Sequence, residues 1–241
     1  MNQKRSYRAQ MKRAGLVRFR VRHKETDLFV QAERDLAGEV SAWVVEARGK
    51  IEAYARSHPG FIESYTPLPY DPLAPEIVRG MLKATNLAGV GPMASVAGAI
   101  AEYVGRRIAQ NGSGEIMVEN GGDIFLRMLS DVTIGIYAGT SPFSGRVGLM
   151  LKGREDSFGV CTSSGTIGHS FSFGSADAVC VISESCALAD AAATAAGNLV
   201  KKKADVDKAL AYLKGLRDVE GGVVIKADAI GAFGALELVP L

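Results

Sequence analysis

The most informative part of the sequence is LADAAATAAGNLV at residues 188–200, which contains one acidic side chain and no basic one. Its alanine-rich composition predicts a helix. Asp190, Thr194 and Asn198 recur at steps of four and therefore share one helical face. A carboxylate with a hydroxyl one turn later offers the hard oxygen ligands that Mg²⁺ prefers. The alternative is that Asp190 caps a neighbouring element or hydrogen-bonds to Thr194, because a buried carboxylate needs a partner.

The segment before this helix is rich in hydroxyl groups and glycine. It contains Cys161-Thr162-Ser163-Ser164-Gly165 at the end of a predicted strand, and His169 follows among further glycines on a predicted loop. Histidine titrates near neutral pH, so His169 is a candidate functional residue. Cys161 could be a nucleophile or a sulfur carrier, although a small buried side chain is the commoner role of a free cysteine.

Further along the chain in both directions, the pattern predicts an α+β fold whose second half is dominated by strands. The strongest turn signal is Asn120-Gly121-Gly122, between strands expected over 115–118 and 123–128. Residues 16–33 alternate apolar and charged side chains around a polar turn, which predicts a hairpin. Further strands are expected over 132–137, 147–152, 158–162, 176–182, 223–225 and 235–239. Helices are expected over 36–57, 76–86, 93–109, 188–200 and 206–216.

The chain is expected to form a single domain over residues 1–241. Hydrophobic residues make up 47% and charged residues 22%, a composition that excludes a disordered protein. Within this domain, residues 1–35 are expected to form a basic N-terminal hairpin. Clustered prolines predict a connecting loop over 60–75.

Charge is unevenly distributed, although the formal net charge is only +2. Residues 1–24 contain nine Lys and Arg side chains and no acidic one. Such a segment could bind phosphate or RNA, but a solvated tail leading into an edge strand is the preferred interpretation. Scattered aromatic residues provide no stacking platform, so nucleic acid is not an expected partner.

Three cysteines in a chain of this length do not suggest a disulfide framework. The uncharged run over 86–101 is too short and too rich in Gly and Ala to span a membrane, and no apolar stretch follows the basic start. These features predict a cytoplasmic protein without a membrane segment. Helices of small residues and open strand edges are compatible with a homodimer.

Several of these motifs, taken in order, resemble the ApbE family of Mg²⁺-dependent flavin transferases. The matching pieces are Glu119-Asn120-Gly121-Gly122-Asp123, Ser163-Ser164-Gly165, His169, and Ala189-Asp190 with Thr194 in an alanine-rich helix. Together they cover about residues 86–200. The N-terminal hairpin and residues 61–75 look more like a small cytoplasmic branch of ApbE-like proteins from anaerobes and archaea.

The resemblance implies a fold and a set of roles. The fold would be ApbE-like, with mixed or antiparallel strands, helices packed on them, and two structurally related halves as an option. Asp190 and Thr194 match the Mg²⁺-binding pair, with a backbone carbonyl near residues 93–94 as a third ligand. His169 matches a histidine near the reacting phosphate, where it would serve as general base. The cofactor-binding positions would be Asn120, Gly121, Gly122, Asp123, Ser163, Ser164 and Gly165.

Two positions depart from the classical transferases. His169 leads into Ser170-Phe171-Ser172-Phe173-Gly174 instead of an Asp-Pro-x-Thr-Gly segment, and Ala97 stands before Gly98 where they have a lysine. The first functional hypothesis is therefore Mg²⁺-dependent binding of a flavin nucleotide (FAD or FMN) or another pyrophosphate, with cleavage or transfer left open. The alternative is a non-transferase accessory protein of sulfur assimilation and homocysteine formation that binds another small metabolite. In that alternative Cys161 gains interest.

Overall fold

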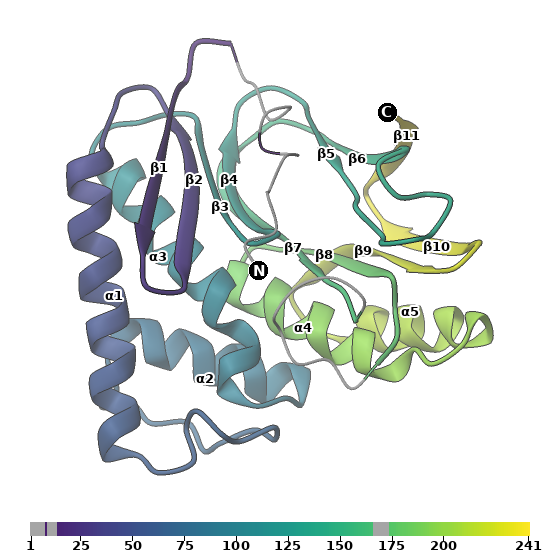
Figure 1. Cartoon of the computed structure of the whole chain (residues 1–241), viewed down its shortest axis with the longest axis horizontal. Helices are drawn as coiled ribbons and strands as arrows, with labels where there is room; N and C mark the ends of the chain where they lie inside the picture. Colours follow the sequence, from purple (N-terminus) through teal and green to yellow (C-terminus); the bar gives the residue numbers. More distant parts are fainter. Residues whose placement is uncertain (1–7, 9–13, 166–173) are drawn as a thin grey trace.

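The computed structural model of the protein describes residue 8 and residues 14–165 and 174–241. Its centre is an eight-stranded antiparallel sheet with the order β1-β2-β3-β4-β7-β8-β9-β10 (Figure 1). The strands of this sheet are β1 (Val17–His23), β2 (Thr26–Ala32), β3 (Ile116–Asn120), β4 (Asp123–Met128), β7 (Arg154–Ser163), β8 (Ala178–Ser183), β9 (Val219–Lys226) and β10 (Ala229–Gly234). A smaller antiparallel sheet has the order β11-β6-β5, with β5 (Val132–Gly135), β6 (Val147–Leu151) and β11 (Glu237–Pro240).

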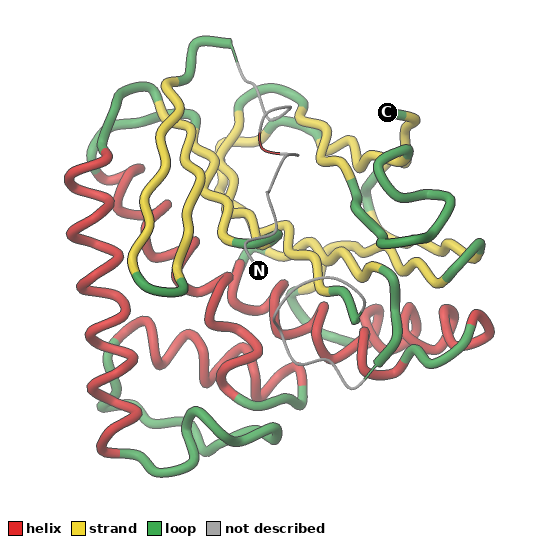
Figure 2. The backbone as a smooth tube through the Cα atoms, viewed as in Figure 1, coloured by secondary structure: helices red, strands yellow, loops and turns green. Residues whose placement is uncertain are grey.

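The helices gather on one side of the large sheet, and the small sheet lies on the other (Figure 2). They are α1 (Ala37–Ser57), α2 (Glu76–Ala88), α3 (Val96–Gln110), α4 (Cys186–Leu199) and α5 (Val206–Gly215), with short 3₁₀ helices over Pro92–Ser95 and Lys203–Asp205. Helix α4 packs on β7 and β8 and also touches α2, α3 and α5. This central helix therefore joins the helical layer to the middle of the sheet.

The large sheet separates two hydrophobic cores. Side chains alternate between the faces of each strand, so Val118 and Phe125 join the core under the helices. Met117 and Leu126, one position away on the same strands, join the core between the two sheets. Both faces of the central strands are buried, which makes β8 almost continuously apolar in sequence, whereas β3 also buries Glu119 and Asn120.

Most of the predicted elements are present, with one strand missed. The expected hairpin over 16–33 is β1–β2, with Val17 paired to Ala32 and His23 to Thr26. The expected helix over 36–57 is α1, which buries Val40, Val44, Ala47 and Ile51. The sequence analysis did not predict β10 because Ala229–Gly234 is rich in alanine and glycine and has no strong alternation. The α+β class is confirmed, and every paired strand among the described residues is antiparallel.

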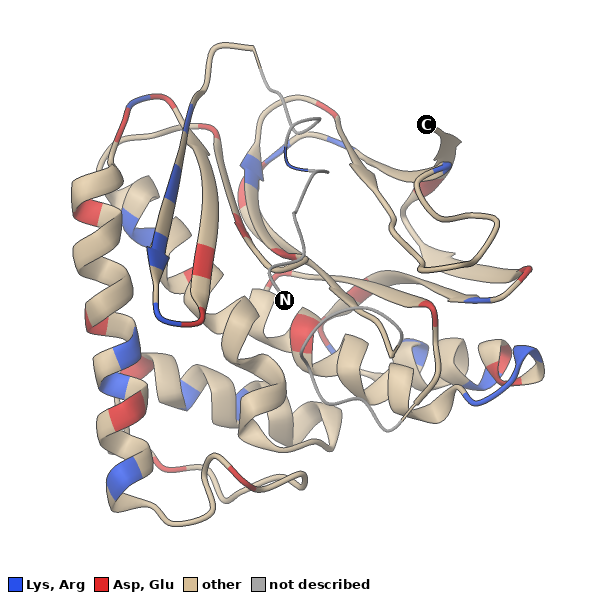
Figure 3. Cartoon of the chain, viewed as in Figure 1, with Lys and Arg blue, Asp and Glu red and all other residues tan. Residues whose placement is uncertain are grey.

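Charged residues are frequent on α1, on the β1–β2 hairpin and around the start of α5, whereas α4 has almost none (Figure 3). Asp190 is the single charged residue between Cys186 and Leu199. Within the described residues, no single helix is long and apolar enough to cross a membrane.

Candidate functional site

The glycine turn joins β3 to β4 as predicted. Asn120 and Asp123 are the last cross-strand pair, which leaves Gly121 and Gly122 as a two-residue turn. Both glycines have positive φ, at 75° and 119°, a conformation that side chains with a Cβ rarely adopt. Asn120 and Asp123 are buried on the face that the helices cover, and the Asn120 Nδ2 group donates a 3.1 Å hydrogen bond to the Ala97 carbonyl. The turn thus places Asn120 against the start of α3 and Asp123 on the same face of the sheet.

Asp190 reaches the same place from α4. Its Oδ2 atom accepts a 2.9 Å hydrogen bond from the Gly98 amide, and the Ala97 amide also bonds to this carboxylate. These are amides of the first turn of α3, which have no partner within their own helix. Close packing makes the contact possible, because a Cβ at Gly98 would collide with the Cys186 carbonyl oxygen. The alternative interpretation of Asp190 as a cap of a neighbouring element is therefore correct as a description of its contacts.

Capping does not compensate the negative charge. Burial raises the pKa of Asp190 to about 7, although the two amides oppose the shift. The pKa of Asp123 is raised well above its usual value, first by burial and then by repulsion from Asp190. In the described part of the chain, no Lys or Arg forms an ion pair with Asp123 or Asp190. Two neighbouring carboxylates in this state provide a charge and donor set that fits a hard divalent cation.

The other predicted metal ligands are Thr194 and a backbone carbonyl near residues 93–94. Thr194 is half-buried one turn beyond Asp190 on α4, and the 3₁₀ helix that contains Met93 and Ala94 packs against α4. Among the described residues there is no group of three or more His, Cys, Asp or Glu side chains that could hold a metal. A cation at Asp123 and Asp190 would therefore complete its coordination with hydroxyl, carbonyl, water or ligand oxygens.

The hydroxyl-rich segment ends β7 beside the glycine turn. The Thr162 amide donates a 3.2 Å hydrogen bond to the Gly122 carbonyl, which holds the turn against this strand. Ser163 is the last residue of β7, and the Gly165 amide bonds to the Ala176 carbonyl at 3.0 Å. The structure thus brings Ser163, Ser164 and Gly165 to the edge of the site. His169 lies outside the described residues.

Cys161 faces the helices but is not accessible. It pairs across the strands with Asp123, and its Sγ donates to the Cys186 carbonyl at 3.3 Å. Burial raises the pKa of the Cys161 thiol well above its usual value, with a smaller contribution from Cys186. A fully buried thiol with a raised pKa is a poor nucleophile. Cys161 therefore packs as a small core residue and offers no support to the sulfur-related alternative.

The sequence analysis did not name Arg8 or Glu119 as site residues. Arg8 was counted in a solvated basic tail, but its side chain is buried and forms an ion pair with Glu119, next to Asn120 in β3. The only signal in the sequence was an acidic residue inside an apolar strand, which needs a cation or hydrogen-bond donors when it is buried.

Comparisons with known proteins agree with this architecture. The model of a family described as "AbpE bacteria" matches residues 8–214. The chain belongs to this family. The UPF0280 protein of Methanococcus aeolicus is 40% identical over 197 residues, which cover 80% of this chain and 79% of that protein. The UPF0280 protein of Methanocaldococcus jannaschii is 42% identical over 220 residues, or 88% of each chain.

Solved structures show the same fold for this ApbE-like chain. The flavinyl transferase ApbE of Pseudomonas stutzeri superposes with a TM-score of 0.62 at 14% identity, over 90% of this chain and 94% of that one. The flavin transferase ApbE of Vibrio cholerae gives a TM-score of 0.58 at 12% identity, over 91% and 97% of the two chains. The predictions of an ApbE-like fold and of a relationship to archaeal ApbE-like proteins are confirmed.

Proposed function

We propose that this ApbE-like protein binds a flavin nucleotide together with Mg²⁺, between the Gly121-Gly122 turn, the end of β7 and helix α4. The observation that carries the proposal is the pair of neighbouring carboxylates, Asp123 and Asp190, which have no Lys or Arg partner among the described residues. Flavin is the ligand class favoured by the names of the solved structures with this fold, which are flavin transferases.

The residues of the site have distinct tasks in this proposal. Asp190 and Thr194 hold the cation, and the Ala97 and Gly98 amides fix the orientation of the Asp190 carboxylate. Bound Mg²⁺ supplies positive charge that neutralises the pyrophosphate of the nucleotide. Asp123 contributes a second carboxylate from the glycine turn, and Ser163 and Ser164 offer hydroxyl groups at its edge. His169 is proposed as the general base if the bound pyrophosphate is cleaved or its FMN part is transferred.

The first test is a titration of FAD into the purified protein, with and without Mg²⁺, followed by flavin fluorescence. We expect binding that requires Mg²⁺ and that weakens at least about tenfold in Asp190→Asn, because the neutral amide loses the attraction for the cation. Asn keeps an oxygen that can cap α3, so folding is preserved. The matched control is Asp207→Asn, which removes an exposed acid from the first turn of α5.

Two further results would bear on the reaction and on the proposal as a whole. Release of FMN and AMP from FAD, detected by chromatography, would show that the bound pyrophosphate is cleaved. Absence of FAD and FMN binding to the wild type at millimolar Mg²⁺ would contradict the flavin proposal and leave the site to another metabolite.

A further inference from the structure

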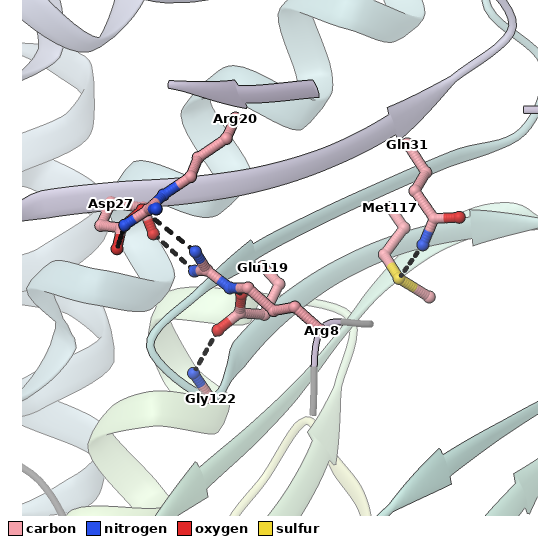
Figure 4. Close-up of polar contacts among 7 residues, drawn as sticks. All are labelled: Arg8, Arg20, Asp27, Gln31, Met117, Glu119 and Gly122. Carbon is pink, nitrogen blue, oxygen red and sulfur yellow. Dashed lines mark hydrogen bonds and ion pairs between the residues drawn. The ribbon is translucent and has the colours of Figure 1, made fainter. Parts of the chain in front are cut away.

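Arg8 forms a buried ion pair on the face of the large sheet opposite the candidate site (Figure 4). Its Nε atom donates to Glu119 Oε2 at 2.5 Å, and its two terminal nitrogens donate to Asp27 Oδ1 at 3.0 Å and to the Asp27 carbonyl at 2.7 Å. The Arg8 and Glu119 side chains are only 8% and 1% exposed. Little water reaches either partner, so each makes a large contribution to compensating the charge of the other.

Glu119 connects this ion pair to the glycine turn. Its second oxygen, Oε1, accepts a 3.0 Å hydrogen bond from the Gly122 amide (Figure 4). The Gly122 carbonyl in turn accepts a hydrogen bond from the Thr162 amide. Glu119 and Asn120 are consecutive on β3, so their side chains point to opposite faces of the sheet. A continuous set of hydrogen bonds thus runs from Arg8 on one face to the turn that bears Asn120 and Asp123 on the other.

We propose that Arg8 is a positioning residue, which holds Glu119 against the Gly122 amide and so fixes the turn that places Asn120 and Asp123 in the site. The positioning of the turn follows from these contacts, and its importance for ligand binding rests on the proposed function. Without Arg8, Glu119 is a buried carboxylate that has lost this guanidinium partner, so its side chain is less firmly held and can move toward water. This change weakens its hold on Gly122.

Arg20 provides an internal control. It also binds Asp27, through two hydrogen bonds of 2.7 Å, but its side chain is 58% exposed. Neither of these hydrogen bonds reaches Glu119 or the glycine turn. Removal of Arg20 therefore takes away a similar guanidinium–carboxylate contact without releasing the turn.

The test compares amide hydrogen exchange in the 119–123 segment for the wild type, Arg8→Gln, Arg20→Gln and the double variant Arg8→Gln/Glu119→Gln. Without ligand, we expect the Gly122 amide to exchange roughly tenfold faster in Arg8→Gln and within about twofold of wild type in Arg20→Gln. The double variant should return to within about threefold, because the neutral side-chain amide that replaces the Glu119 carboxylate can still accept from Gly122. Rescue by the second substitution would not occur if Arg8 contributed only packing.

An unchanged Gly122 amide in Arg8→Gln, or a double variant that exchanges as fast as Arg8→Gln, would overturn the proposal. If Arg8→Gln does not fold, the double variant decides alone: a folded protein with a protected Gly122 supports the role, and an unprotected Gly122 overturns it.

A second measurement links the turn to the ligand. The Kd for FAD with Mg²⁺ should rise about tenfold in Arg8→Gln, stay within about twofold of wild type in Arg20→Gln, and recover in the double variant. Faster exchange with an unchanged Kd would overturn the positioning role. If the wild type does not bind FAD, the flavin proposal fails, and the exchange experiment still decides whether Arg8 fixes the turn.

Discussion

Glu119 and Asp123 lie four residues apart on one hairpin, buried on opposite faces of the large sheet. On the face toward the small sheet, Glu119 is compensated by the Arg8 guanidinium and by the Gly122 amide. On the helical face, Asp123 lies near Asp190, and each carboxylate receives hydrogen bonds that fail to prevent a rise in its pKa. One face therefore has an ion pair, whereas the other has two neighbouring carboxyl groups with raised pKa values and no Lys or Arg partner in the described part of the chain.

Under the proposed function, the difference separates a structural face from a ligand-binding face. A compensated buried carboxylate holds backbone in place, as Glu119 does for Gly122. Two uncompensated carboxylates cost stability in the free protein, and a cation that neutralises them recovers that stability on binding. Substitutions on the two faces should therefore change stability in opposite directions.

The largest effect is expected for Arg8→Met, which removes the cation from the compensated face. We expect a loss of about 3–5 kcal/mol in the free energy of unfolding, the usual result of leaving one partner of a buried ion pair. Urea unfolding at pH 7 measures it, and the added Glu119→Gln substitution should recover at least half of the loss. A loss below about 1 kcal/mol would place Arg8 with ordinary surface pairs and remove the contrast.

The opposite sign is expected for Asp190→Asn on the uncompensated face. The folded-state pKa of about 7 lies above the ordinary value of 3.8, so the stability contributed by this group falls as pH rises from about 4 to about 7. At pH 8 with a chelator, the variant should be more stable than wild type by roughly 2–4 kcal/mol, since one pKa unit corresponds to about 1.4 kcal/mol. The advantage should vanish near pH 4. If the wild type is more stable than Asp190→Asn at pH 8, the charge of Asp190 is compensated by contacts other than those described above.

Mg²⁺ binding should depend on pH through the same carboxylate. Protons and the cation compete for Asp190, so the apparent affinity should fall up to about tenfold for each pH unit below 7. The shift of the melting temperature with Mg²⁺ at pH 5.5, 6.5 and 8 measures this dependence. In Asp190→Asn this dependence should be reduced, and a slope equal to that of wild type would exclude Asp190 as the competing group.

Local pattern predicted much of the fold and made Asp190 a candidate site residue, whereas Asp123 was a candidate through the family resemblance. The two glycines after Asn120 are sufficient to predict the β3–β4 turn, and the spacing of Val40, Val44 and Ile51 predicts the buried face of α1. Asp123 and Asp190 could each be named from the sequence, but their proximity could not. It depends on the packing of α4 against β7 and β4, which Gly159 permits by its close approach to Cys186, and this is a product of tertiary packing.

Arg8 shows the limit of such reasoning most clearly. It lies 111 residues from Glu119 in the sequence and among eight other basic residues of 1–24, so nothing local distinguishes it from a solvated side chain. Only the strand order, which places β2 between β1 and β3, brings Asp27 and Glu119 close enough to bind one guanidinium. Burial of a charge is a property of the assembled sheet.

The smallest effect is expected for Arg20→Gln, which removes the exposed partner of the same Asp27. Its bidentate contact with Asp27 raises the pKa of Arg20, yet the side chain is mostly in water and Asp27 keeps its hydrogen bonds from Arg8. We expect a loss of less than about 1 kcal/mol that shrinks further in 1 M salt, because exposed ion pairs are weak and screened. Urea unfolding at two salt concentrations, run beside Arg8→Met, compares two arginines that share one carboxylate. If both substitutions lower the free energy of unfolding by the same amount, burial does not distinguish the two arginines. Desolvation would then not explain the contrast between the two faces of the sheet.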